Sequence, residues 1–333
     1  MNKILTSTKN IFSSSKKWKK VPVALLPFAD AASLEMPFSK LVKLSLFQVS
    51  VGIGIVLLVG TLNRIMIVEL GVSASIVAIM VGLPVLVAPF RALVGFRSDT
   101  HKSVIGWRRV PYIWIGTLLQ FGGLSIMPFA LILLSGDTHW PLWFGPLAAG
   151  FAFLLVGIGI QTVQTAGLAL ATDLSPEKNK PRVVALMYTM LLLGMVFSSM
   201  IFSFLLEPFS QFRLIQVIQS AAVICFFLNV FALWKQEPRN PELTSPKKSA
   251  PKFWMMWCKF SENPNTKRFL LALGIGTAAF GMQDVILEPY GGQILNLSVS
   301  ETTMLTAYST LGSILSFGIA AWFLKQGVNP HRI

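Results

Sequence analysis

Two carboxylates lie four residues apart in an apolar stretch of this 333-residue chain. Asp284 and Glu288 are the only charged residues in the run 280–293. In a helix, residues i and i+4 project from the same face. A charge in membrane hydrocarbon costs at least about 2.5 kcal/mol, so such groups face a protein interior or a wet cavity. We therefore predict a functional face formed by Asp284 and Glu288, with Gln283 at its edge.

The helix that carries this face is expected to end soon after Glu288. Pro289, Gly291 and Gly292 follow it directly, and proline and glycine interrupt helices. Glu288 would then lie close to the membrane surface. The alternative to a functional face is a capped or water-exposed helix end.

The composition is that of a membrane protein. The chain is 53% hydrophobic and 13% charged, whereas a soluble domain carries about 25% charged residues. A helix of about 20 apolar residues crosses the ~30 Å of hydrocarbon, and period-2 alternation typical of barrel strands is missing. We predict an all-α polytopic membrane protein with about eight transmembrane helices. The apolar segments lie near 41–67, 74–96, 111–134, 142–171, 183–206, 212–234, 269–291 and 301–325.

Basic residues alternate from one side of the predicted spans to the other. The net charge is +14, but the positive charge gathers in the N-terminal segment and in every second connection. The opposite connections hold only Arg64 and Arg213. Cytoplasmic loops collect Lys and Arg, so this pattern predicts a cytoplasmic N-terminus and contact with the lipid bilayer. Nucleic acid is not an expected partner.

The charge pattern also divides the chain. We predict a cytoplasmic N-terminal segment (1–39), a six-helix half (40–234), a cytoplasmic linker (235–267) and the first two helices of a second half (268–333). Within the linker, the aromatic segment 253–260 predicts a short interfacial helix. Six helices, a linker and further helices are typical of transporters built from parallel six-helix halves.

No catalytic or metal site is predicted. The chain has neither a phosphate-binding loop nor a dinucleotide-binding glycine motif. Asp99, Asp137 and Asp173 are isolated in the sequence, so clustered aspartates for magnesium diphosphate are not expected. Cys225 and Cys258 are expected to be free thiols. We therefore do not expect an enzyme.

One connection has the pattern of a loop signature. Gly95 and Asp99 are followed by Arg108 and Arg109, and this arrangement resembles the loop signature of the major facilitator superfamily. Gly95 would allow close helix approach, and Asp99 would pair with Arg108 or Arg109. The alternative is a solvated turn whose positive charge only orients the chain.

Several longer segments resemble one branch of that superfamily, the PucC/LhaA or bacteriochlorophyll delivery family. The resemblance implies a light-harvesting complex assembly protein that brings bacteriochlorophyll to antenna polypeptides or shepherds those polypeptides. It implies antenna polypeptides, bacteriochlorophyll or its synthesis machinery as partners, and the inner photosynthetic (intracytoplasmic) membrane as location. The segments that carry it are 44–52, 62–70, 88–92, 106–114, 161–167 and 283–293.

A pigment carried inside such a protein would need a magnesium ligand. All three histidines fall in predicted loops, so amide and carboxylate groups remain, and magnesium accepts oxygen ligands. For Gln161 and Gln164, the alternative is hydrogen bonding between neighbouring helices. The candidates for binding pigment or partner are Asn63, Gln161, Gln164, Gln283, Asp284 and Glu288.

The resemblance implies twelve spans, of which this chain holds about eight, so we expect a fragment or a truncated gene product. No intrinsic cofactor is expected, and any bacteriochlorophyll would be bound transiently. A secondary transporter that moves a small solute by alternating access remains the alternative function, because fold does not decide function.

Overall fold

The computed structural model describes residues 37–103, 106–136, 139–238, 244 and 252–327. Within these ranges the chain forms helices and no strand. Three short segments, η4 (Val56–Leu62, a π-helix) and the 3₁₀ turns η5 (Ala88–Phe90) and η6 (Glu177–Asn179), join or precede longer helices. The α-helices are α1 Phe38–Ile55, α2 Asn63–Val68, α3 Ala74–Val87, α4 Arg91–Asp99, α5 Val110–Leu134, α6 Phe144–Asp173, α7 Lys180–Leu205, α8 Gln211–Leu233, α9 Phe253–Ser261, α10 Pro264–Gln293 and α11 Val299–Lys325.

Eight of the helical stretches in the described residues are long and apolar enough to cross a membrane. They coincide with the eight segments expected from the sequence, so the prediction of an all-α polytopic membrane protein is confirmed. The first span, Phe38–Val68, combines α1, η4 and α2, and the second, Ala74–Asp99, combines α3, η5 and α4.

The first span is the centre of the bundle. Helix α1 packs against α6, α7 and α8, and α5 and α6 form a closely packed antiparallel pair beside it. Side chains that α1 buries, among them Leu44, Phe47 and Val51, are fully enclosed by these neighbours. The core therefore lies around α1, and the packing of this helix also fixes the position of the residues that follow it in the first span.

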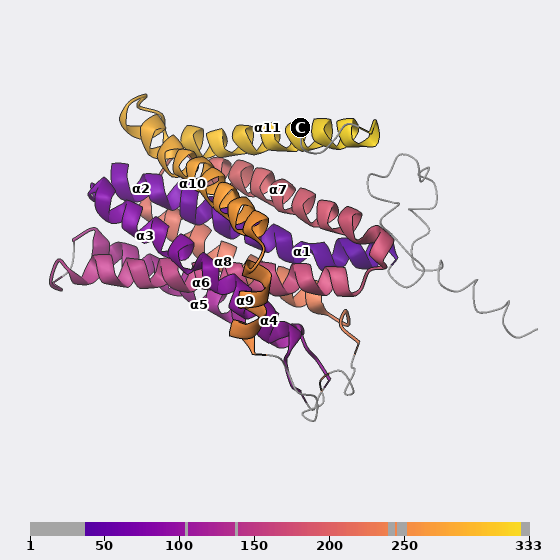
Figure 1. The fold of residues 1–333 in the computed structure, drawn as a ribbon. Coiled ribbons are helices and arrows are strands. Elements are labelled where there is room, and N and C mark those ends of the chain that lie inside the picture. The colour runs from indigo at the N-terminus through magenta and orange to yellow at the C-terminus, as the bar shows by residue number, and fades with distance from the viewer. Residues whose placement is uncertain (1–36, 104–105, 137–138, 239–243, 245–251, 328–333) are drawn as a thin grey trace, which may run out of the picture.

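The last two spans lie on one side of this core. Helix α10 crosses the bundle diagonally and contacts η4 and α2, and α11 runs beside α7 (Figure 1). The α7–α11 contact includes a polar pair near one end, in which the Ser203 hydroxyl donates to the Ser300 carbonyl oxygen over 2.9 Å. Most of the remaining surface of α10 is exposed.

A short helix, α9, is present where the aromatic segment predicted one, and its position at the membrane interface stays a prediction. The rings of Phe96 and Phe253 meet edge to face at 5.4 Å between centroids, which places α9 against the end of α4. Trp254 is 70% exposed, and Trp257 is also exposed. Almost all of the predicted N-terminal segment and the chain after residue 327 lie outside the described residues, and the division into domains stays a prediction.

The connections after α4, α6 and α8 define what we call the basic end of the bundle; the connections after α2, α5, α7 and α10 define the opposite end. We predict that the basic end is cytoplasmic, because Lys and Arg gather there. In a variant with Cys258→Ser, an impermeant maleimide should label Leu142→Cys from the periplasm. It should label Lys178→Cys only after the membrane is opened.

Leu142 and Lys178 are both exposed, so their labelling should differ only by the side of the membrane on which they lie. The native Cys225 is buried and serves as an internal blank. Periplasmic labelling of Lys178→Cys would reverse the assignment.

Candidate functional site

A buried polar cluster joins the first span to α10. Glu288 is 1% exposed, and the Thr306 hydroxyl of α11 donates a hydrogen bond to its Oε1 atom. Gly60 of η4 faces this carboxylate, and a Cβ atom at Gly60 would collide with Oε1. The absence of a side chain at Gly60 is therefore what lets the Glu288 carboxylate lie between the two spans.

Helix α10 does not end at Pro289, as the sequence predicted, but continues to Gln293. A proline inside a helix has no N–H to donate to the carbonyl four residues earlier. For Pro289 this carbonyl belongs to Val285, and it accepts a hydrogen bond of 2.6 Å from the Asn63 side chain of the first span. In hydrocarbon such a freed carbonyl must find a partner, and Asn63 supplies it.

Two buried oxygens beside this contact have no hydrogen-bond partner among the described residues. They are Oδ1 of Asn63 and Oε2 of Glu288. Each is an acceptor in a place from which bulk water is excluded, since Asn63 is 0% exposed and Glu288 1% exposed. The cluster therefore combines one structural hydrogen bond with free acceptor capacity.

Arg64 extends the cluster toward the opposite end of the bundle. It forms an ion pair with Glu69, and its Nη2 atom donates to the Leu297 carbonyl over 3.0 Å. A Cβ atom at Gly292 would lie 3.0 Å from Nε of Arg64, so this glycine leaves room for the guanidinium.

The backbone that presents Gly60 and Asn63 is unusual. The seven residues Val56–Leu62 form a π-helix between α1 and α2. Helices widen in this way mostly at functional sites. Here the widened turn lies opposite α10, directly before Asn63.

The two carboxylates predicted to form one face differ in surroundings. Glu288 is buried, whereas Asp284 and Gln283 are exposed on the open side of α10. Asp284 also lines a cavity of about 50 Å³ together with Gly60 and Thr306. The helix continues past Pro289 to Gln293, and Thr306 covers the Glu288 carboxylate, so Glu288 is not a water-exposed helix end; its depth below the membrane surface stays a prediction.

Gln161 and Gln164 of α6 contact the second span. Gln161 donates over 2.9 Å to the carbonyl of Pro84, a carbonyl left free where Ala88 donates to Val85 instead. Gln164 accepts from Nη2 of Arg91 over 2.8 Å. Both amides hold neighbouring helices together, which is the alternative interpretation of these two residues.

A second charged cluster lies at the basic end. Asp99 pairs with Arg109, which confirms one of the two predicted pairings. Arg109 also donates to Ser98 over 2.6 Å and to Asp173 over 3.0 Å, and Arg108 donates to Asp173 over 2.6 Å. Asp173, expected to be isolated, therefore joins α6 to the start of α5.

Glu237 is another member of this cluster, and no motif in the sequence predicts its role. Its carboxylate accepts from the backbone N–H groups of Arg108, Arg109 and Val110, over 2.8–3.1 Å, and so caps α5 from the chain that follows α8. A carboxylate at a helix N-terminus is also favoured by the helix dipole. The only available signal was a lone acid beside a proline.

Gly95 does not have the role expected of it. A Cβ atom there would lie 3.6 Å from the Thr165 methyl group, which is ordinary van der Waals contact. The loop signature therefore works through its charges. Among the described residues, no three His, Cys, Asp or Glu side chains come together as metal ligands.

Fold and site define a polytopic helical membrane protein whose first and seventh spans are joined by a buried polar contact. The chain belongs to the PucC family, since the family model described as PUCC protein matches residues 61–333. It is 55% identical to Protein PucC of Cereibacter sphaeroides and 56% identical to Protein PucC of Rhodovulum sulfidophilum, each over 92% of this chain and 68% of the relative. It is 53% identical to an uncharacterized protein of the puhA-bchM intergenic region of Rhodobacter capsulatus, over 92% of this chain and 65% of the relative.

The hydrogen bond from Asn63 to Val285 predicts an energetic coupling with Pro289. Asn63→Leu should destabilise the protein by roughly 1–3 kcal/mol, because it leaves a buried carbonyl unpaired. In a Pro289→Ala background the same change should cost clearly less, because alanine restores the backbone donor. Unfolding of the purified protein by dodecyl sulfate measures both effects.

Asn229→Leu is the matched control, since Asn229 is equally buried but lies in α8. Its cost should not depend on residue 289. Equal costs of Asn63→Leu in both backgrounds would contradict the role assigned to this side chain.

At the basic end we predict unequal roles for two neighbouring arginines. The Arg109 side chain is 5% exposed and bonds to three partners, so Arg109→Ala should cost roughly 1–3 kcal/mol. The Arg108 side chain is 28% exposed, so Arg108→Ala should cost about 0–1 kcal/mol. Thermal aggregation of the detergent-solubilised protein measures both, and equal losses would show that only the number of positive charges matters.

Proposed function

We propose that this protein is an integral membrane assembly factor for photosynthetic light-harvesting complexes. In this proposal it delivers bacteriochlorophyll to antenna polypeptides or shepherds them. The observation that carries it is membership of the PucC family at 55% identity over 92% of the chain. The relatives named PucC support a role in photosynthetic complex assembly. We further propose that the chain is related to LhaA and to the major facilitator superfamily.

The location and partners follow from this proposal. The protein would lie in the bacterial inner, intracytoplasmic membrane with its N-terminus in the cytoplasm. Its partners would be antenna polypeptides, bacteriochlorophyll or its synthesis machinery, and lipid. Bacteriochlorophyll would be a transient cargo, and we propose neither a catalytic role nor an intrinsic cofactor.

The structure limits the positions at which a pigment or polypeptide could bind. The cavity beside Asp284 is about 50 Å³, which is little more than the ~30 Å³ that one water occupies in the liquid. A pigment macrocycle does not fit there. Asn63, Gln161 and Gln164 already hold neighbouring helices, so the remaining accessible candidates are Gln283 and Asp284.

These two side chains are exposed along α10 at membrane depth, and Asp284 lies at the border between this exposed face and the small cavity beside Gly60. Phe280, one turn before Asp284 on the same side of the helix, is 74% exposed, and Ile286, three residues after Gln283, is 57% exposed. A carboxylate exposed to hydrocarbon is costly, so this face is best explained by an occupant. A pigment or the transmembrane helix of an antenna polypeptide would offer both apolar surface and hydrogen-bonding groups.

A secondary transporter is the second candidate. The observation that favours it is Glu288, a buried carboxylate between the first span and α10 whose Oε2 atom has no partner among the described residues. Such an acid could couple a proton to movement of the two spans. Co-purification separates the candidates: an assembly factor should carry pigment and small antenna polypeptides, and a transporter should be colourless and accumulate a solute in vesicles.

We predict that the two parts of the α10 face behave differently when altered. Gln283→Ala with Asp284→Ala should reduce antenna assembly several-fold and leave the level of the protein unchanged, because both side chains are exposed. Glu288→Ala should reduce both together, because its carboxylate joins α10 to α11. Near-infrared absorption of membranes reports antenna, and an immunoblot reports the protein.

Glu262→Ala is the control, since Glu262 is exposed in the connection between α9 and α10. It should change neither quantity. Full antenna assembly in the Gln283/Asp284 variant would remove the open face of α10 from the proposed function.

A further inference from the structure

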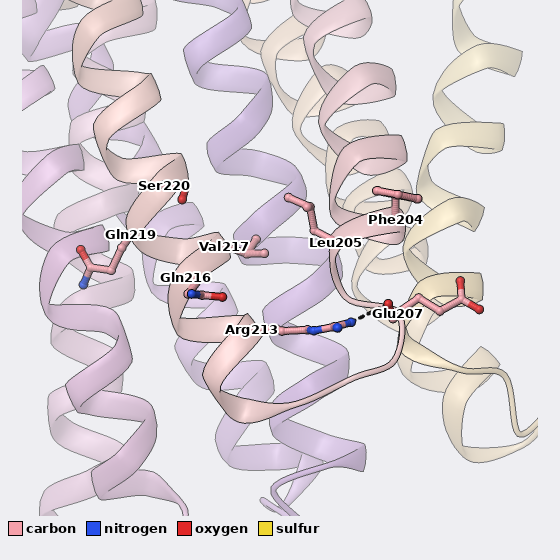
Figure 2. Close-up of a pocket in the computed structure, with 8 residues that line it drawn as sticks. All are labelled: Phe204, Leu205, Glu207, Arg213, Gln216, Val217, Gln219 and Ser220. Atoms are coloured by element: carbon pink, nitrogen blue, oxygen red, sulfur yellow. Dashed lines mark hydrogen bonds between the residues drawn. The ribbon is translucent and has the colours of Figure 1, made fainter.

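A larger cavity lies away from this site, between the adjoining ends of α7 and α8 at the opposite end of the bundle. Its volume is about 810 Å³, within the ~300–1,000 Å³ typical of small-molecule sites. Figure 2 shows its lining, with residues of α7 on one side and one face of α8 on the other. The residues that line it are Phe204, Leu205, Glu207, Arg213, Gln216, Val217, Gln219 and Ser220.

The α8 side of the cavity is polar inside an apolar span. Arg213, Gln216 and Ser220 follow at i, i+3 and i+7, so they line one face of the helix. Gln216 and Ser220 are exposed toward the cavity and make no hydrogen bond to a side chain or backbone group of the described residues. Unpaired amide and hydroxyl groups at membrane depth are costly, so these two side chains call for a hydrogen-bonding occupant.

Arg213 lies at the mouth of the cavity and is already oriented. Its Nη1 atom donates to the carbonyls of Glu207 and Pro208, over 2.6 and 3.1 Å. Its other guanidinium donors have no acceptor among the described residues, and a guanidinium has five N–H groups in total. Held in this way, Arg213 can offer the remaining donors to an anion at little entropic cost.

The acid in the cavity wall does not neutralise this arginine. The Glu207 side chain extends away from Arg213 (Figure 2), and its Oε2 atom accepts from the Ser300 hydroxyl of α11 over 3.0 Å. Apart from Arg64, which lies inside the first span, Arg213 is the only lysine or arginine in or next to the connections of the opposite end. The mouth of the cavity therefore combines a positive charge with free donors.

We propose that this cavity binds a phospholipid of the adjacent leaflet. The phosphate would accept from Arg213 at headgroup depth, the ester carbonyls from Gln216 and Ser220 one to two turns deeper, and an acyl chain would lie against Phe204, Leu205 and Val217. Along α8 the charged group lies at the mouth and the polar groups lie deeper, which is the order of the phosphate and the ester groups in the lipid. A lipid wedged there would support α7, the helix against which α11 packs.

The test uses the purified full chain in neutral detergent and measures its thermal stability. Phosphatidylglycerol should raise the unfolding temperature. Diacylglycerol with the same acyl chains and inorganic phosphate at equal concentration should each raise it far less. Equal stabilisation by diacylglycerol would remove the anionic headgroup from the proposal, and equal stabilisation by phosphate would make this a free-anion site.

Two cavity variants test whether the stabilisation by phosphatidylglycerol arises at this cavity. Arg213→Gln removes the charge, and Gln216→Leu with Ser220→Leu removes the polar lining without introducing a charge into the span. Each should weaken the apparent affinity for phosphatidylglycerol by roughly tenfold, the loss expected for one hydrogen bond to a charged group in Arg213→Gln and for two neutral hydrogen bonds in the Gln216/Ser220 variant. Gln211→Leu, on the same helix but outside the cavity, should behave as the unaltered protein does.

Phosphatidylglycerol stabilisation that is unchanged in both cavity variants would overturn the proposal. So would bacteriochlorophyll that co-purifies with the protein and is lost only in these variants, since the occupant would then be pigment. Because the readout is lipid-dependent stability, the result does not depend on whether the protein assembles antenna complexes.

Discussion

The arrangement of the last two spans depends on one backbone carbonyl that its own helix cannot satisfy. Pro289 has no backbone N–H, so the Val285 carbonyl lacks its usual helical donor. In hydrocarbon a carbonyl without a hydrogen-bond partner is costly. Asn63, which lies 222 positions before Val285 in the chain, supplies the missing donor. The hydrogen bond fixes α10 against the first span, and Gly60, Thr306 and Glu288 then have defined places around the contact.

The same requirement explains much of the buried polarity in the described bundle. The second span is interrupted by the 3₁₀ turn Ala88–Phe90, and Gln161 supplies a donor to the Pro84 carbonyl that the interruption frees. At the basic end, Glu237 accepts from the first N–H groups of α5, which no helical carbonyl can reach. Amides and carboxylates inside this protein are thus used first to complete its backbone, and only the remainder is available for ligands.

Much of this could be predicted from the sequence, because it is local. Hydropathy located all eight spans, the aromatic segment located α9, and spacing suggested the pairing of Asp99 with Arg109. Contacts between distant segments could not be predicted in the same way. Nothing near Asn63 reveals Val285 as its partner, and nothing near Asp173 or Glu237 reveals the start of α5, because these pairings arise only when helices pack. The continuation of α10 beyond Pro289 was missed for the same reason, since the side chain that makes it tolerable belongs to another span.

The π-helix Val56–Leu62 has a consequence for how the first span tolerates change in length. Each residue of an α-helix turns the chain by about 100°. The widened turn holds one residue more than the ordinary helical turn that it replaces, at about the same total rotation. Loss of one residue from Val56–Leu62 would therefore let it relax to an ordinary helix with α2 close to its present orientation, and Asn63 and Arg64 would keep their partners. Loss of one residue from the regular part of α1 would instead rotate the residues beyond it by about 100°, away from α10. The surplus residue is thus a reserve that lets the first span lose one residue at this turn without exchanging the partners of Asn63 and Arg64.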